Sequence, residues 1–123
     1  MYSLKIKRIY SAAGPEDGYR VLVDRLWPRG IRKEAAGLDD WARNIAPSTE
    51  LRKSFAHQRE RFDAFQTAYR EELDANPEAQ TFAGICRKEL LSRNVTLLYA
   101  AKDESCSNAP VLCEWVREQM EKG

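Results

Sequence analysis

Apolar residues along the chain predict three strands. Residues 4–10 alternate apolar and charged side chains, which is typical of a strand with one buried face. Residues 19–26 and 95–101 instead contain apolar runs, Val21-Leu22-Val23 and Val95-Thr-Leu-Leu-Tyr-Ala-Ala. Such runs indicate strands buried on both faces, as in the interior of a parallel sheet.

Apolar residues at helical spacing predict four helices. A short helix is expected over 39–45, a long one over 49–75, a third over 78–93, and a last one that begins near 108–110. Ser48 is a suitable N-cap for the long helix, and Asn76-Pro77 ends it.

The long helical stretches between the strands require crossover connections, which place the strands parallel. The chain has 123 residues, enough for one ordinary domain but not for two with separate cores. The predicted fold is therefore one small α/β domain over residues 1–123, with a short, mostly parallel sheet of about three to four strands packed with helices. The pattern leaves the order of the strands open.

Composition narrows the classes of function. Lys and Arg number 20 against 19 Asp and Glu, so a net charge of +1 gives no overall field that would attract nucleic acid or an acidic membrane surface. No stretch approaches the ~20 apolar residues of a membrane span, and the first residues do not resemble a signal peptide. Three cysteines without metal-ligand spacing are typical of reduced thiols. We expect a cytoplasmic protein without a metal site, and no cofactor is identified.

Polar segments follow two of the predicted strands. Asp24-Arg25-Leu26-Trp27-Pro28-Arg29-Gly30 follows the second strand, and Lys102-Asp103-Glu104-Ser105-Cys106-Ser107-Asn108 follows the third. In open parallel sheets, ligands bind outside the carboxyl ends of the strands. If these strands are parallel neighbours, both segments face one pocket, and the predicted ligand-binding residues are Asp24, Arg25, Trp27, Arg29, Lys102, Asp103 and Asn108.

The side chains of the first segment suit an anion, but each also has a structural interpretation. Arg25 and Arg29 present planar donor groups for a carboxylate or phosphate, and the N-terminus of the last helix adds free backbone N–H groups. Trp27 offers its face to a ring or a cation. Alternatively, Asp24 and Arg25 pair to hold the loop, and Trp27 covers the core.

Three further side chains are candidates for chemistry. Asp103 would act as a base or orient a substrate, or would hydrogen-bond its own loop. Cys106 lies just ahead of the last helix, whose dipole favours a thiolate, although no base is evident beside it. His57 is the only histidine, and its charged helical surroundings are typical of a solvated side chain.

Three segments resemble hallmark stretches of the YeaO-like family, or domain of unknown function 488. They are Asp24-Arg25-Leu26-Trp27-Pro28-Arg29-Gly30, Ala46-Pro47-Ser48 followed by Leu51-Arg52-Lys53, and Leu97-Leu98-Tyr99-Ala100-Ala101-Lys102-Asp103. The resemblance spans nearly the whole chain and implies a bacterial cytoplasmic protein, without an established activity or catalytic residues. Family members tend to carry histidine beside asparagine near the start of the last helix, where this chain has Ser107-Asn108.

These observations favour a protein that binds a small anionic molecule at the C-terminal edge of the sheet, with or without a reaction. The sequence contains no Gly-rich phosphate loop, dinucleotide fingerprint or nucleophile elbow. One alternative is a nucleic-acid-associated or regulatory module that uses Arg25, Arg29, Arg32 and Lys33, with Trp27 stacked on a base. Another is a protein-interaction or oligomeric module anchored by Trp27 and Trp41. The oligomeric state is left open.

Overall fold

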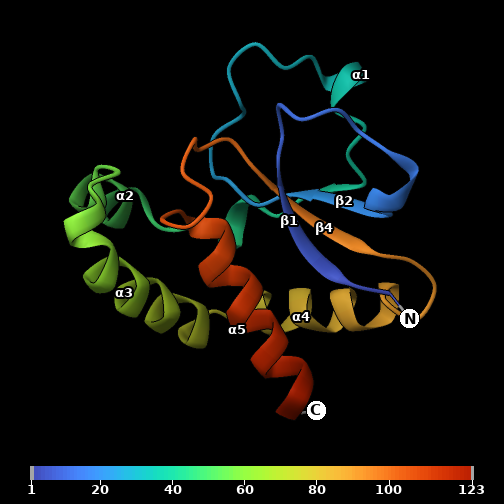
Figure 1. The fold of residues 1–123 in the computed structure, drawn as a ribbon. Coiled ribbons are helices and arrows are strands. Elements are labelled where there is room, and N and C mark those ends of the chain that lie inside the picture. Colours follow the sequence, from blue (N-terminus) through green and yellow to red (C-terminus); the bar gives the residue numbers. More distant parts are fainter. Residues whose placement is uncertain (1, 123) are drawn as a thin grey trace.

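A parallel sheet of four strands forms the centre of the fold (Figure 1). The computed structural model describes residues 2–122, and Met1 and Gly123 lie outside the described part. The strand order is β1-β4-β2-β3, and every neighbouring pair is parallel. The strands are β1 (Leu4–Arg8), β2 (Tyr19–Leu22), β3 (Asp40–Trp41) and β4 (Val95–Tyr99). The predicted α/β class is confirmed, and β2 and β4 are indeed parallel neighbours.

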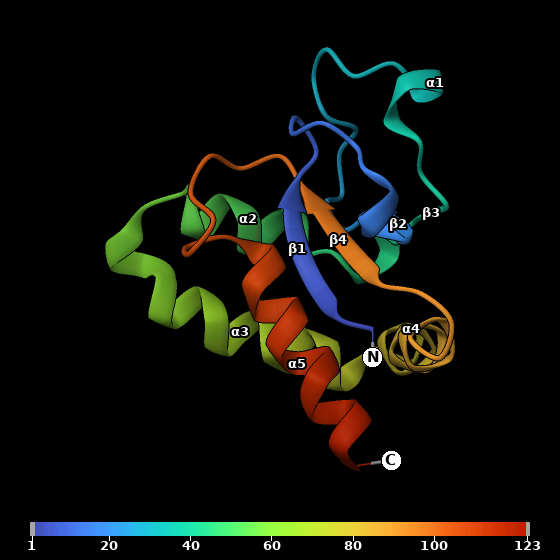
Figure 2. The same cartoon turned by 45° about the vertical axis from the view of Figure 1, so that its right-hand side comes forward.

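Three helices cover one side of the sheet. Figures 1 and 2 show α3, α4 and α5 together on this side, whereas α1 lies away from them on the opposite side of the molecule. The helices are α1 (Lys33–Ala36), α2 (Thr49–Phe55), α3 (Phe62–Ala75), α4 (Pro77–Glu89) and α5 (Asn108–Lys122). Single 3-10 turns occur at Pro15–Asp17, Arg43–Ile45 and Arg59–Arg61.

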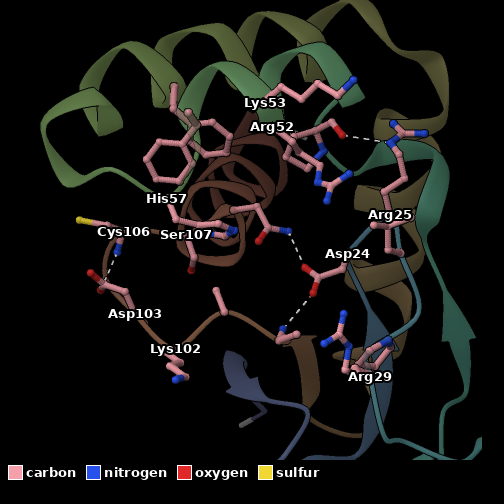
Figure 3. Close-up of a pocket in the computed structure, with 18 of the residues that line it drawn as sticks. Asp24, Arg25, Arg29, Arg52, Lys53, His57, Lys102, Asp103, Cys106 and Ser107 are labelled. Carbon is pink, nitrogen blue, oxygen red and sulfur yellow. Dashed lines mark hydrogen bonds between the residues drawn. The ribbon is translucent and has the colours of Figure 1, made fainter.

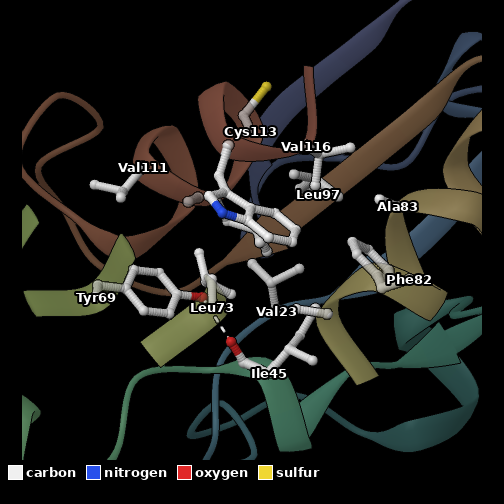
Figure 4. Packing of buried hydrophobic residues seen from close by; sticks show 14 of the residues in the cluster. Val23, Ile45, Tyr69, Leu73, Phe82, Ala83, Leu97, Val111, Cys113 and Val116 are labelled. Carbon is white, nitrogen blue, oxygen red and sulfur yellow. Dashed lines mark hydrogen bonds between the residues drawn. The ribbon is translucent and has the colours of Figure 1, made fainter. Parts of the chain in front are cut away.

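The main core lies between the sheet and these helices (Figure 4). All five residues of β4 are buried, as the apolar run predicts for an interior strand. Trp115 of α5 is fully buried, and its Nε1 donates to Asp74 at 2.9 Å. Tyr69 is also buried, and its hydroxyl donates to the Ile45 carbonyl at 2.8 Å. Each large side chain that is buried in this way stabilises the fold by about 1.5–3 kcal/mol.

All three predicted strands end earlier than expected. The strand predicted over 4–10 ends at Arg8, the one over 19–26 ends at Leu22, and the one over 95–101 ends at Tyr99. Beyond these ends, side chains replace some of the strand partners. After β4, the carbonyl groups of Ala100 and Ala101 accept hydrogen bonds from the Arg8 guanidinium at 3.0 and 2.9 Å. These side-chain contacts fix the chain where the pocket begins.

The prediction of a helix over 39–45 is wrong. Its apolar residues have helical spacing, but the chain forms β3 and then a 3-10 turn, Arg43–Ile45. Pairing with β2 decides this outcome, because the Ala42 N–H donates to the Leu22 carbonyl at 2.9 Å and the Asp39 N–H donates to the Arg20 carbonyl at 2.8 Å. The sheet therefore gains a fourth strand.

The long helix predicted over 49–75 is interrupted. It consists of α2, a 3-10 turn and α3, and Ala56 and His57 between them have positive φ angles of 50° and 56°. The predicted cap at Ser48 is confirmed, since its Oγ accepts the Leu51 N–H at 3.2 Å. The interruption folds α2 against α3, where Phe55 stacks on Phe65 with 4.4 Å between ring centroids, and α2 shares the cavity wall with the loop after β4.

Candidate functional site

A cavity of about 810 Å³ opens at the carboxyl ends of β2 and β4 (Figure 3). Its volume is typical of sites for small molecules. The structure brings all seven predicted site residues to its wall, including Arg29 and Lys102 from the two loops: Asp24, Arg25, Trp27, Arg29, Lys102, Asp103 and Asn108. That these residues bind a ligand stays a prediction.

Asp24 fixes the cavity where the two strands end. One carboxylate oxygen accepts the Ala100 N–H at 2.9 Å, and the other accepts the Asn108 side-chain amide at 3.0 Å. Burial raises the pKa of the Asp24 carboxyl, although these hydrogen bonds and the nearby Arg52 and His57 oppose the rise. Asp24 does not pair with Arg25 as the structural alternative supposed, because its two oxygens already bind the loop after β4 and α5.

Arg25 and Trp27 have structural roles. Arg25 donates from Nε to the Pro47 carbonyl at 3.0 Å and from Nη2 to the Ala46 carbonyl at 2.9 Å, so its guanidinium holds the segment before α2. Trp27 donates from Nε1 to the Ile31 carbonyl at 2.7 Å, and its ring packs edge-on against Trp41 at 5.3 Å between centroids. Both side chains therefore shape the wall of the cavity.

Arg29 and Lys102 are exposed cations at the mouth of the cavity. The Arg29 backbone is held because its carbonyl accepts the Tyr10 hydroxyl at 2.8 Å. Gly30 follows with a φ angle of 80°, the positive value that glycine permits. Among residues 2–122, neither the Arg29 guanidinium nor the Lys102 amine forms a hydrogen bond or an ion pair. Both are available to an anion.

Asp103 organises its own loop. One carboxylate oxygen accepts the N–H groups of Ser105 and Cys106 at 2.9 and 3.0 Å, and the other is 3.3 Å from Arg59 Nη1. The Cys106 N–H and the Ser105 groups lower the pKa of the Asp103 carboxyl. The structure therefore favours the loop-holding interpretation of Asp103 over that of a base.

The wall also contains residues that were not in the predicted site, among them Arg52, Lys53, His57 and Ser107. His57 was interpreted as a solvated side chain, and Arg52 and Lys53 were named only in the family-like segment, because nothing in the sequence shows that α2 ends at Phe55 and faces the loop after β4. Within the described chain, the Arg52 and Lys53 side chains have no hydrogen-bond or ion-pair partner. The sequence signal that could have placed Arg52 and Lys53 in the site is their occurrence in the family-like segment Leu51-Arg52-Lys53.

The cysteines and the histidine do not form a catalytic pair. No hydrogen bond joins the Cys106 thiol to His57, and Figure 3 shows the Cys106 sulfur directed away from the centre of the cavity. Burial raises the pKa of the Cys86 thiol to about 12 and also raises that of Cys113, so both thiols stay protonated in the core. Residues 2–122 contain no cluster of histidine, cysteine and acidic side chains that would hold a metal ion. No helix in this range is long and apolar enough to cross a membrane.

Comparison with known proteins identifies the family. A family model described as the inactive DUF488-N3 subclade matches residues 3–123. The chain belongs to this family. The uncharacterised protein YeaO of Escherichia coli K12 is 44% identical to this DUF488 protein over 116 residues, which cover 94% of this chain and 97% of YeaO. An uncharacterised protein of Mycobacterium tuberculosis is 40% identical over 112 residues, which cover 90% of this chain and 91% of the relative. No solved structure matches the DUF488 protein.

Proposed function

We propose that this protein binds a small anionic molecule, one that carries a carboxylate or phosphate group, in the cavity at the C-terminal edge of the sheet. One observation carries the proposal: four cationic side chains on the wall have no partner among residues 2–122, namely Arg29, Arg52, Lys53 and Lys102. The two carboxylates on the same wall, Asp24 and Asp103, are already engaged by N–H donors.

The cavity wall is much more positively charged than the molecule as a whole. The whole chain has a net charge of +1, whereas the wall has five cationic side chains, including Arg25, and two carboxylates. Like charges that converge on one cavity repel one another unless an anion lies between them. Such an anion would form charge-assisted hydrogen bonds with the arginines, which are stronger than neutral ones.

Binding without turnover fits the observations better than catalysis. The matching family model is described as inactive, and the wall contains no nucleophile hydrogen-bonded to a base among the described residues. Catalytic nucleophiles are normally activated by such a base. We therefore propose a ligand-binding protein and name no reaction.

The two alternative functions gain less support. In the nucleic-acid alternative, Arg25 would bind backbone phosphates, but its Nε and Nη2 already donate to the Pro47 and Ala46 carbonyls. Stacking on Trp27 is hindered because this ring packs against Trp41. Both rings are also partly buried, which limits their use as anchors for a partner protein. No contact favours either function over anion binding.

Isothermal titration with pyrophosphate and citrate tests the proposal. The variant combines Arg29→Ala with Lys102→Ala, and the control combines Arg32→Ala with Lys88→Ala, which removes the same two charges from exposed positions outside the cavity. We expect the wild type to bind at least one of the two anions, the cavity variant to lose about tenfold in affinity, and the control to stay within about twofold. The proposal fails if neither anion binds at millimolar concentration, or if both double variants lose affinity equally.

A further inference from the structure

We propose that the bound anion is a phosphoryl group, and that it is held at the N-terminus of α5 by the Ser107 hydroxyl and the first backbone N–H groups of the helix. The inference rests on the proposed function and specifies it. It places the phosphoryl group of a small molecule against the α5 side of the cavity, with the remainder of the molecule in the rest of the 810 Å³.

The N-terminus of α5 keeps its backbone donors free. α5 has 15 residues and begins at Asn108, so the N–H groups of Asn108 and Ala109 have no acceptor within the helix. No other described residue accepts a hydrogen bond from them. The Asn108 side chain does not cap the helix, because its amide donates to the Val23 carbonyl and to Asp24 at 3.0 Å each. A helix end of this kind attracts anions through its N–H groups and its dipole.

Ser107 provides the second, independent observation. It immediately precedes α5, lines the cavity and is only 2% exposed, yet its Oγ has no hydrogen-bond partner among residues 2–122. An N-cap hydroxyl normally accepts an N–H from the second or third helical residue. Here the third is Pro110, which has no N–H, and the second, Ala109, forms no such bond. The hydroxyl is therefore left for a partner that the fold does not supply.

A ligand oxygen is the partner that this position suits. Buried hydroxyl groups without a hydrogen bond are rare and costly. The Ser107 Oγ is itself shielded from solvent in the structure, and it would reach a ligand oxygen in the cavity by rotation about the Cα–Cβ bond. Figure 3 shows Ser107 on the wall of the cavity together with Cys106 and Asp103 of the same loop. The Asp103 carboxylate does not compete for the hydroxyl, because it accepts hydrogen bonds from Ser105, Cys106 and Arg59.

Cations on two other walls complete the arrangement. Arg52 of α2 is close enough to Asp24 to lower the pKa of its carboxyl, and Asp24 is bonded to the first residue of α5. Arg52 therefore lies near the helix end, and Figure 3 shows it between α2 and Asp24. Lys102 reaches the same cavity from the loop after β4.

The directions of these donors favour a phosphoryl group over a carboxylate. Two N–H groups come from the start of α5 and a hydroxyl from Ser107 just before it, whereas guanidinium and ammonium groups come from separate walls. A phosphoryl group presents three terminal oxygens that diverge in space and carries close to two negative charges, so it can meet donors from several walls at once. A carboxylate has only two oxygens, which lie in one plane, and would leave some of these donors without a partner.

Isothermal titration with phenyl phosphate and benzoate tests the inference, because the two probes share a ring and differ in the anionic group. Ser107→Ala removes only the hydroxyl, and because that group is buried without a partner the variant is expected to be at least as stable as the wild type in thermal unfolding. We expect it to lose about fivefold or more in affinity for phenyl phosphate and to stay within about twofold for benzoate. Ser92→Ala, an exposed serine at the far end of the sheet, is the matched control and should change neither affinity.

The outcomes separate the inference from the proposed function. If Ser107→Ala leaves the affinity for phenyl phosphate unchanged while Arg29→Ala weakens the binding of both probes, the phosphoryl site is overturned and anion binding stands. The same holds if Ser107→Ala weakens both probes equally, since the hydroxyl would then not distinguish the two groups. If neither probe binds the wild type although pyrophosphate or citrate does, the inference fails and the proposed function stands. If none of the four anions binds, both fail.

Discussion

The Asp24 carboxylate accepts the side-chain amide of Asn108 at 3.0 Å, which joins the loop after β2 to the first residue of α5. Its second oxygen accepts the Ala100 N–H at 2.9 Å, and Asn108 also donates to the Val23 carbonyl. Three separate segments that surround the cavity are thus fixed by one carboxylate. The shape of the site therefore depends on Asp24, both of whose carboxylate oxygens accept hydrogen bonds from the fold.

Asp24→Asn should destabilise the protein. An asparagine keeps the shape but replaces one acceptor oxygen by an NH₂ group, which would face either the Ala100 N–H or the Asn108 amide. We expect the free energy of unfolding to fall by about 1–3 kcal/mol, the cost of a buried polar group that loses its partner. Urea unfolding followed by tryptophan fluorescence measures the change. Asp63→Asn, at an exposed position of α3, is the control, and equal stability of the two variants would contradict this role of Asp24.

The sequence predicted those parts of the site that depend on strands alone. Apolar runs located β2 and β4, and parallel strands place their carboxyl ends together, so the loops that contain Arg29 and Lys102 could be expected on one cavity. It did not predict the contributions that depend on tertiary contacts. Helix α2 ends at Phe55 without a glycine or proline to mark the end. The sequence therefore gave no reason to predict that Arg52 lies on the cavity wall.

The same limit explains the error at β3. Asp40–Trp41 is too short for its alternation to be visible, and the spacing of Leu38, Trp41, Ala42 and Ile45 is the spacing of a helix. Pairing with β2 overrides this local pattern. The indole of Trp41 then donates to the Asp24 carbonyl at 2.7 Å, a contact between the edge strand and the site that no local pattern contains.

Arg25→Ala should lower the stability of the protein, whereas Arg29→Ala should leave it nearly unchanged. Arg25 donates two hydrogen bonds to the carbonyls before α2, so its loss should lower the free energy of unfolding by about 1–3 kcal/mol. Arg25→Lys should recover little, because an ammonium group does not match two neighbouring carbonyls as a guanidinium does. Arg29→Ala should change the free energy of unfolding by no more than about 0.5 kcal/mol, as is usual at exposed positions. Thermal unfolding of the three variants tests this, and a large loss in Arg29→Ala would show that this arginine is structural.

A buried ion pair between Asp17 and cations of β1 and β2 predicts a specific response to acid. Asp17 is 1% exposed and accepts hydrogen bonds from Lys7 at 3.0 Å and from Arg20. Burial raises the pKa of the Asp17 carboxyl, but the hydrogen bonds from Lys7, the Gly14 N–H and Arg20 outweigh burial and hold the pKa below 3.8. Because the pKa is lower in the folded state, this stabilisation is complete above pH 3.8 and is lost as the pH falls through the folded pKa.

Asp17→Asn should therefore destabilise the protein only where Asp17 is ionised. At neutral pH we expect a loss of about 3 kcal/mol in the free energy of unfolding, because the Arg20 guanidinium stays buried without its counter-charge. The difference from the wild type should be constant between neutral pH and about pH 5 and should shrink below pH 3.8. Urea unfolding at a series of pH values gives this profile. A difference that persists unchanged in acid would mean that shape, and not charge, is what Asp17 contributes.

Ala56→Gly should stabilise the protein, because the turn that directs α2 toward the cavity is strained. Ala56 ends α2 with a φ angle of 50°, in the left-handed region that costs a residue with a Cβ atom roughly 1–2 kcal/mol, and glycine avoids this cost at helix ends. Part of the gain is offset by the greater freedom of glycine in the unfolded chain, so we expect the free energy of unfolding to rise by about 0.5–1 kcal/mol. Ala64→Gly, at an exposed position inside α3, is the matched control and should lower it by about 1 kcal/mol. If both variants lose stability in urea unfolding, the turn at Ala56 is not strained, and another contact must hold α2 against the loop after β4.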